Sequence, residues 1–185
     1  KESPRSDYER RNVPEPLQLA VRRLRMFWGD QFSYLGPIRD DPKVIFAAPT
    51  DIERRNVGIK GEFTAAALTE WGNVEIEYPP PPMKDDLAFL NCKKGTLAEA
   101  VVLWLRHMGL VDEVSTRELA KVGYELTVHS VGLKKRLDLM NVGVGVSQVL
   151  PTLVMSLIAL PGSTLVLEQP ELHLHPKVQS ILGDF

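Results

Sequence analysis

The sequence places a carboxylate where nucleotide chemistry often needs one, at the end of a short apolar strand. Residues 164–167 (TLVL) predict a buried strand, and Glu168 follows it directly. A carboxylate at a strand end can orient water on Mg²⁺ beside nucleotide phosphates. Because many strands end in glutamate, this feature becomes informative only through its position, one predicted helix after a glycine-rich turn.

That turn covers residues 141–145, and the sequence predicts a helix from there to about residue 160. Ser147 is expected to cap the helix, and Pro151 is expected near its first turn, where a missing N–H costs least. Glycines before a capped helix create an anion site, because free backbone N–H groups and the helix dipole point at the same place. A tight turn that opens a core helix explains this segment equally well.

Taken together, VGVGVSQVLP (142–151) and TLVLEQPELHLHP (164–176) resemble the signature loop, Walker B strand and D-loop of ABC-type ATPase heads. The resemblance is to prokaryotic AAA-type ATPases of the SMC, RecF and OLD-like kind. The strings YLGPIR (34–39) and VGIKGE (57–62) also resemble segments of that group. The fold that this implies is α/β, an incomplete lobe of a P-loop NTPase-like head.

In that family two heads enclose ATP, and the signature loop of one head faces the γ-phosphate held by the other. The resemblance therefore implies ATP and Mg²⁺ as cofactors and a second head, a homodimer in trans, as partner. Glu168 would take the Walker B role at Mg²⁺, and Ser147 would be the main side-chain donor of the signature loop. The residues assigned to nucleotide contact are Gly143, Gly145, Ser147, Gln148 and His175.

The sequence departs from the family in its catalytic parts. The Walker A pattern is absent, so we expect it in an N-terminal segment or a separate chain, and we expect residues 1–185 alone to be inactive. Glu168 replaces the usual Asp, and Gln169 replaces the usual catalytic Glu. An amide cannot act as a general base, a role worth about 10²–10⁴-fold. Either Glu171 substitutes through water, or Gln169 orients the attacking water, or hydrolysis is slow. The loop also matches the usual L-S-G-G-Q only loosely.

Two other interpretations remain open. A head that binds ATP without turnover would explain Gln169. A zinc hydrolase could use Glu171, His173 and His175, with His129 as the only further candidate ligand.

The rest of the chain divides simply. The sequence predicts a mobile polar segment at residues 1–15 and the partial head at residues 16–185. Within the head, the prolines at 79–82 are expected to form a stiff connector. Helices are expected at 16–29, 64–71 and 96–108, the last with a capping box from Thr96 and Glu99. Strands are expected after residue 31, at 74–78, 122–128 and 134–139. The resulting lobe should have a largely parallel core, flanking helices and inserted antiparallel strands.

The composition fits such a protein. The chain has 185 residues, 44% of them hydrophobic, a net charge of −2 and a single cysteine, Cys92. No internal disulfide can form, and no global basic field points to nucleic acid or membranes. The longest apolar run, 149–160, is shorter than the roughly 20 residues of a spanning helix. We therefore expect a cytoplasmic ATPase whose dimerisation controls an effector or, by analogy with relatives, a DNA-linked process in repair or phage defence.

Overall fold

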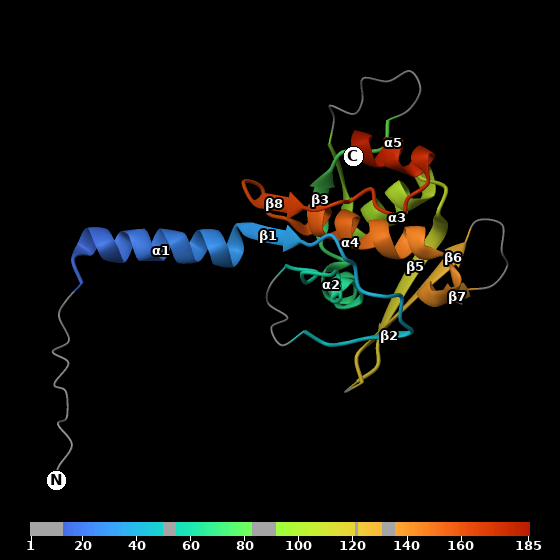
Figure 1. Cartoon of the computed structure of the whole chain (residues 1–185), viewed down its shortest axis with the longest axis horizontal. Helices are drawn as coiled ribbons and strands as arrows, with labels where there is room; N and C mark the ends of the chain where they lie inside the picture. Colours follow the sequence, from blue (N-terminus) through green and yellow to red (C-terminus); the bar gives the residue numbers. More distant parts are fainter. Residues whose placement is uncertain (1–12, 50–54, 83–91, 121, 131–135) are drawn as a thin grey trace, which may run out of the picture.

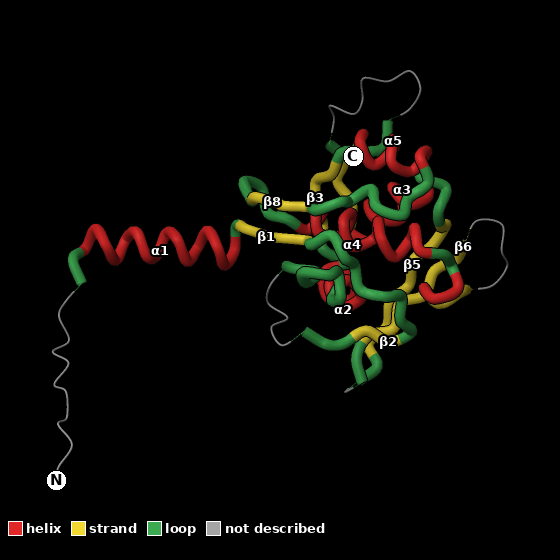
Figure 2. Tube along the Cα trace, in the orientation of Figure 1, coloured by secondary structure: helices red, strands yellow, loops and turns green. Residues whose placement is uncertain are grey.

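The computed structural model describes residues 13–49, 55–82, 92–120, 122–130 and 136–185, which form a mixed α/β structure (Figures 1 and 2). The helices are α1 (Glu15–Asp30), α2 (Thr64–Trp71), α3 (Leu97–His107), α4 (Val144–Ile158) and α5 (Pro176–Asp184), with a 3₁₀ turn at Leu139–Asn141. The strands are β1 (Phe32–Leu35), β2 (Ile45–Phe46), β3 (Glu75–Tyr78), β4 (Lys93–Thr96), β5 (Val111–Glu118), β6 (Tyr124–Ser130), β7 (Arg136–Asp138) and β8 (Thr164–Leu167).

Helix α3 follows directly from its sequence. The Thr96 hydroxyl accepts a hydrogen bond from the Glu99 N–H at 3.2 Å, and the Glu99 carboxylate accepts one from the Thr96 N–H at 2.9 Å. This capping box satisfies two N–H groups that the helix cannot satisfy itself. The predicted stripe is fully inside the core, so the helix prediction is confirmed: the buried residues are Leu97, Val101, Trp104, Leu105 and Met108.

The core forms where α2 and α3 pack on the β5–β6 sheet and α4 packs on both helices. Helix α4 is apolar around most of its circumference, which is typical of a helix surrounded by protein. Pro151 lies in the middle of α4, so its predicted first-turn position is wrong; the helix begins a turn earlier than expected. Gly61, at φ +77°, allows the neighbouring loop to approach, because a Cβ there would come within 2.6 Å of Pro151.

Among the described residues the parallel part is one strand pair, so the prediction of a largely parallel core is wrong; the core helices pack on the antiparallel β5–β6 sheet. Strands β1 and β8 pair in parallel, with Tyr34 opposite Val166 and Leu35 opposite Leu167. The other pairs are antiparallel: β3 with β4, and β6 with β5, β2 and β7. Strand β8 was predicted to be buried, but it is only half-buried, with Val166 37% exposed. The reason is that β1 is its one neighbouring strand in the described structure.

Several boundaries differ from the predictions. Val122 is 66% exposed and lies in the turn before β6 rather than in the strand. Strands β2, β4 and β5 were not predicted. The expected polar segment falls mostly on residues 1–12, which lie outside the described residues, as does the start of the strand expected at 134–139. The prolines at 79–82 lie in an irregular segment after β3.

Candidate functional site

The carboxyl end of β8 holds Glu168 beside β1. The Glu168 N–H continues the parallel ladder by donating to the Leu35 carbonyl at 2.9 Å. The Tyr34 hydroxyl donates to the Glu168 carboxylate at 2.9 Å, so the side chain of an exposed residue is held in place. Sequence reasoning picked out YLGPIR as a string but missed this contact, because the two residues are 134 positions apart.

Arg39 supports the same strand end from inside. It is 6% exposed, and its Nη2 donates to the Glu168 carbonyl at 3.2 Å. Among the described residues, its Nε and Nη1 atoms have no hydrogen-bond partner. Burial lowers the pKa of Arg39, and the nearby Tyr34 opposes that effect. Burial of a guanidinium with one carbonyl acceptor lowers the free energy of unfolding. The fold tolerates this loss of stability at the turn that Arg39 holds in place.

The contact with Glu168 should be visible in the titration of Tyr34. The hydrogen bond to Glu168 raises the pKa of Tyr34, and burial and the charge of Glu168 act in the same direction, against Arg39. Because the pKa is raised in the folded state, this contact stabilises the fold while Tyr34 is protonated and is lost as pH rises through the raised value. Ultraviolet difference titration against Tyr34→Phe measures it. We expect Glu168→Ala to lower the pKa of Tyr34 toward its ordinary value, because the hydrogen bond and the charge of Glu168 are both removed; an unchanged pKa would contradict the contact.

The turn after Glu168 has an unusual backbone. Gln169 has φ +45° and His173 has φ +61°, both in the left-handed region that non-glycine residues rarely adopt. The side chain of Gln179 in α5 holds the turn by donating to the carbonyls of Glu171 and Leu174 at 3.3 and 3.0 Å. Two such residues in one exposed turn are typical of functional segments, where surrounding contacts support the strain.

His175 has a structural task in this arrangement. It is the N-cap of α5, and its Nδ1 accepts a hydrogen bond from the Lys177 N–H at 3.3 Å. Glu171 and His173 are exposed. No group of three or more His, Cys, Asp and Glu residues that could hold a metal occurs among the described residues, which leaves the zinc interpretation without a ligand set.

The start of α4 differs from the prediction. Gly143 is the N-cap, at φ +82°, and no side chain caps the helix. Ser147 lies inside the first turns, is 4% exposed, and its hydroxyl donates to the Val144 carbonyl at 2.8 Å. The predicted N-cap role of Ser147 is therefore wrong, because a glycine at positive φ starts the helix earlier. Gln148 is half-buried, whereas Gly143 and Val144 are exposed, so the helix begins at the surface with no side-chain cap on its first N–H groups.

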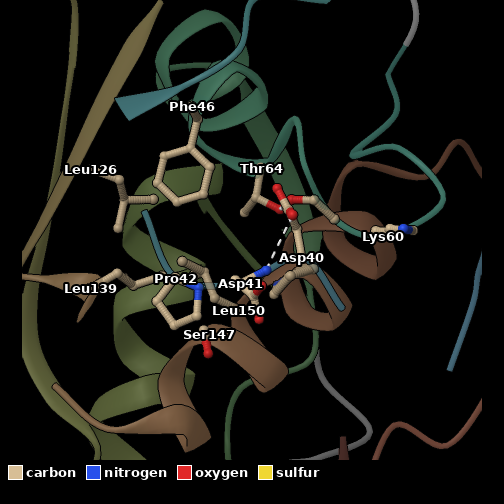
Figure 3. Close-up of a pocket in the computed structure, with 12 residues that line it drawn as sticks. Asp40, Asp41, Pro42, Phe46, Lys60, Thr64, Leu126, Leu139, Ser147 and Leu150 are labelled. Carbon is tan, nitrogen blue, oxygen red and sulfur yellow. Dashed lines mark hydrogen bonds between the residues drawn. The ribbon is translucent and has the colours of Figure 1, made fainter. Parts of the chain in front are cut away.

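Ser147 borders a small interior pocket rather than a nucleotide-sized one (Figure 3). The cavity has a volume of about 20 Å³ and lies between α4, the segment 40–42 and the loop before α2. That volume accommodates about one water molecule. The buried Ser147 hydroxyl, which donates to the Val144 carbonyl, is therefore not presented to a space that could hold a nucleotide.

The two predicted parts of the site do not form one cluster; the approach between them is made by Leu174, in the turn after Glu168. Leu174 is buried at the end of the strained turn and packs near the start of α4, where a Cβ on Gly145 would lie 3.9 Å from its side chain. No hydrogen bond joins Ser147 to Glu168 in the part of the chain that the structure describes. The structure thus has an acidic strand end at Glu168 and a helix start without a side-chain cap at Gly143. Leu174, in the turn after the strand, packs near that helix start.

Were this strand end to hold a metal, its one carboxylate would suit a magnesium ion better than a metal that needs several protein ligands. Mg²⁺ typically takes one or two carboxylates and completes its shell with water and substrate phosphates. Glu168 offers one exposed carboxylate, which accepts a hydrogen bond from the neutral hydroxyl of Tyr34.

Comparison of the chain with protein-family models, with curated proteins and with solved structures returned no match. Within the described residues, no helix has the length and apolar character needed to cross a bilayer.

Proposed function

We propose that this chain is part of an ABC-type ATPase head of P-loop NTPase-like fold, which pairs with a second head around ATP and Mg²⁺. The observation that carries the proposal is the carboxyl end of β8. There an exposed carboxylate, Glu168, is fixed by Tyr34 and a buried arginine at the end of a parallel strand pair. Ligands of α/β proteins bind at the carboxyl ends of such strands.

The strand pair supports a P-loop supplied by other polypeptide. Parallel sheets normally contain more than two strands and are covered on both faces. Strand β8 has one described neighbour, and its outer face is partly exposed at Val166. A further strand carrying the P-loop would pair along one edge of this strand pair and bring phosphates close to Glu168.

The start of α4 supports contact with a nucleotide bound by the second head. Its first-turn N–H groups are uncapped and lie beside exposed Gly143 and Val144. Such a helix end attracts phosphate, because the N–H groups and the helix dipole act together. Pairing of two heads would bring this end of one chain to the phosphates near Glu168 of the other.

In this arrangement Glu168 would orient the metal's water shell, and Gln169, held at positive φ, would orient the attacking water. Bound Mg²⁺ would neutralise charge on the transferring phosphoryl group. With an amide in place of the usual base, we propose slow turnover, suited to a long-lived closed pair that controls an effector or a DNA-linked process. A head that senses ATP without turnover remains the second candidate, favoured by Gln169.

Val144→Asp tests the helix start. An acid in the first turn stabilises an isolated helix by about 0.3–1 kcal/mol, so the fold should be unharmed. The same charge repels an incoming phosphate, and we expect ATP-dependent pairing to weaken by at least about tenfold. The experiment uses a protein that joins residues 1–185 to the proposed P-loop, and sedimentation velocity with and without ATP measures pairing.

Val144→Asn supplies the uncharged control, and Val122→Asp makes the same charge change at a distant exposed turn. Both should pair normally. Residues 1–185 alone should show no micromolar ATP binding by calorimetry. Normal pairing by Val144→Asp would remove the helix start from the proposal, and micromolar binding by the isolated chain would remove the need for a separate P-loop.

A further inference from the structure

The two oxygens of the Glu168 carboxylate have different surroundings. The Tyr34 hydroxyl donates a hydrogen bond to Oε1 at 2.9 Å. Among the described residues, Oε2 accepts no hydrogen bond and takes part in no ion pair. Because the residue is exposed, Glu168 presents one oxygen to a ligand and keeps the other engaged within the chain.

The pairing of β1 with β8 holds the Tyr34 hydroxyl at this oxygen. The parallel ladder extends beyond β8, where the Glu168 N–H donates to the Leu35 carbonyl at 2.9 Å. Directly after β1, the Gly36 N–H donates to the Ile59 carbonyl at 2.8 Å, and a Cβ on Gly36 would lie 3.5 Å from the Tyr34 hydroxyl oxygen. The backbone on both sides of the contact is therefore fixed, so the hydroxyl and Oε1 are held together by the fold.

The number of free carboxylate oxygens bears on which divalent cation binds. Ca²⁺ takes six to eight oxygen ligands in flexible geometry and often binds both oxygens of one carboxylate. Mg²⁺ is smaller, requires nearly octahedral geometry and keeps several of its waters. A hydroxyl proton on Oε1 occupies space that a cation bound to both oxygens would need, and it uses part of the acceptor capacity of that oxygen. The contact with Tyr34 therefore opposes two-oxygen binding.

We propose that Tyr34 determines the metal specificity of this strand end: by occupying Oε1 it makes Glu168 a one-oxygen ligand, which favours Mg²⁺ over Ca²⁺. Tyr34 acts through Glu168 and is therefore a positioning residue. Its hydroxyl is neutral, so the negative charge of the carboxylate remains for the metal. This inference rests on the proposed function, because it requires a metal held between Glu168 and nucleotide phosphates.

Tyr34→Phe tests this specificity in a protein that joins residues 1–185 to the proposed P-loop. The variant keeps an aromatic ring on β1 and frees Oε1 of Glu168. Sedimentation velocity gives the Mg²⁺ and the Ca²⁺ concentrations at which ATP-dependent pairing is half-maximal. We expect the ratio of these concentrations to shift in favour of Ca²⁺ by at least about fivefold. The far-ultraviolet circular dichroism should stay unchanged.

Tyr124→Phe is the matched control. The Tyr124 hydroxyl in β6 donates to the Glu70 carboxylate of α2 at 3.3 Å, so this variant removes a similar contact from another part of the described structure. Its ratio of half-maximal concentrations should equal that of the wild type. An equal shift in Tyr124→Phe and Tyr34→Phe would overturn the proposal, because the change would then follow from a general loss of stability.

The outcomes separate this inference from the proposed function. If the wild type pairs with ATP and Mg²⁺ but Tyr34→Phe has an unchanged ratio, or one shifted toward Mg²⁺, the inference alone is overturned. If the wild type pairs with ATP in neither metal, the proposed function is overturned and this inference with it.

Discussion

Replacement of Trp104 by alanine is expected to lower the free energy of unfolding by about 3–5 kcal/mol. Trp104 is fully buried in α3 and packs edge-on against Phe185 with ring centroids 4.9 Å apart. Its Nε1 donates to the Pro79 carbonyl at 3.0 Å, which attaches the proline segment to the core. The loss combines buried apolar area, a cavity and one broken hydrogen bond. Urea denaturation followed by circular dichroism measures it.

Trp104→Phe separates these contributions. It keeps an aromatic ring in the core but leaves the Pro79 carbonyl without its donor, which costs about 1–3 kcal/mol. Val122→Ala, at an exposed turn, should change stability by less than about 0.5 kcal/mol. A change below 1 kcal/mol for Trp104→Ala would show that α3 does not form the centre of the core.

Elements with strong local signals could be predicted from the sequence. Helix α3 combines a capping box with an apolar stripe, and β8 is a short apolar run between turn residues, so neighbouring residues determine both. Strands β4 and β5 carry no such signal. The sequences KKGT and VDEVSTRE are polar and poorly alternating, and each becomes a strand through pairing with β3 or β6. Pairing of this kind depends on distant partners, which propensity does not encode.

In the candidate site, too, features set by neighbouring residues could be predicted, and features set by distant pairing could not. Glu168 could be placed at a strand end because the apolar run before it is local. The support from Tyr34 and Arg39 depends on the β1–β8 pairing, which brings distant segments together. Ser147 was misplaced because serine is a favoured N-cap, whereas Gly143 adopts the backbone angle that starts α4 and leaves Ser147 buried. The preference for serine at N-caps therefore placed the start of α4 one turn too late.

Glu168→Gln is expected to lower ATP turnover by about 100-fold or more in a protein that joins this chain to the proposed P-loop, since a metal site contributes several kcal/mol to transition-state stabilisation. The amide can still accept the Tyr34 hydrogen bond, so the turn should be preserved and the loss should come from the missing charge. Phosphate release at several Mg²⁺ concentrations measures it.

Companion variants assign the remaining roles. Glu171→Gln makes the same change in the same exposed turn, and turnover should be retained if Glu171 takes no part. If Gln169 occupies the position of a general base, Gln169→Glu should raise turnover by up to about 10²–10⁴-fold. Neither variant disturbs the contacts from Gln179, which are made to backbone carbonyls.

These results distinguish an enzyme from a sensor. A slow enzyme loses phosphate release in Glu168→Gln and gains it in Gln169→Glu, because the machinery around Glu168 already holds water and metal. A sensor releases phosphate at the same background rate in both variants and in the wild type, yet still pairs in the presence of ATP. Pairing without turnover would mean that the strained turn, the buried Arg39 and the Tyr34 contact serve to hold a nucleotide-bound shape, with ATP acting as a ligand.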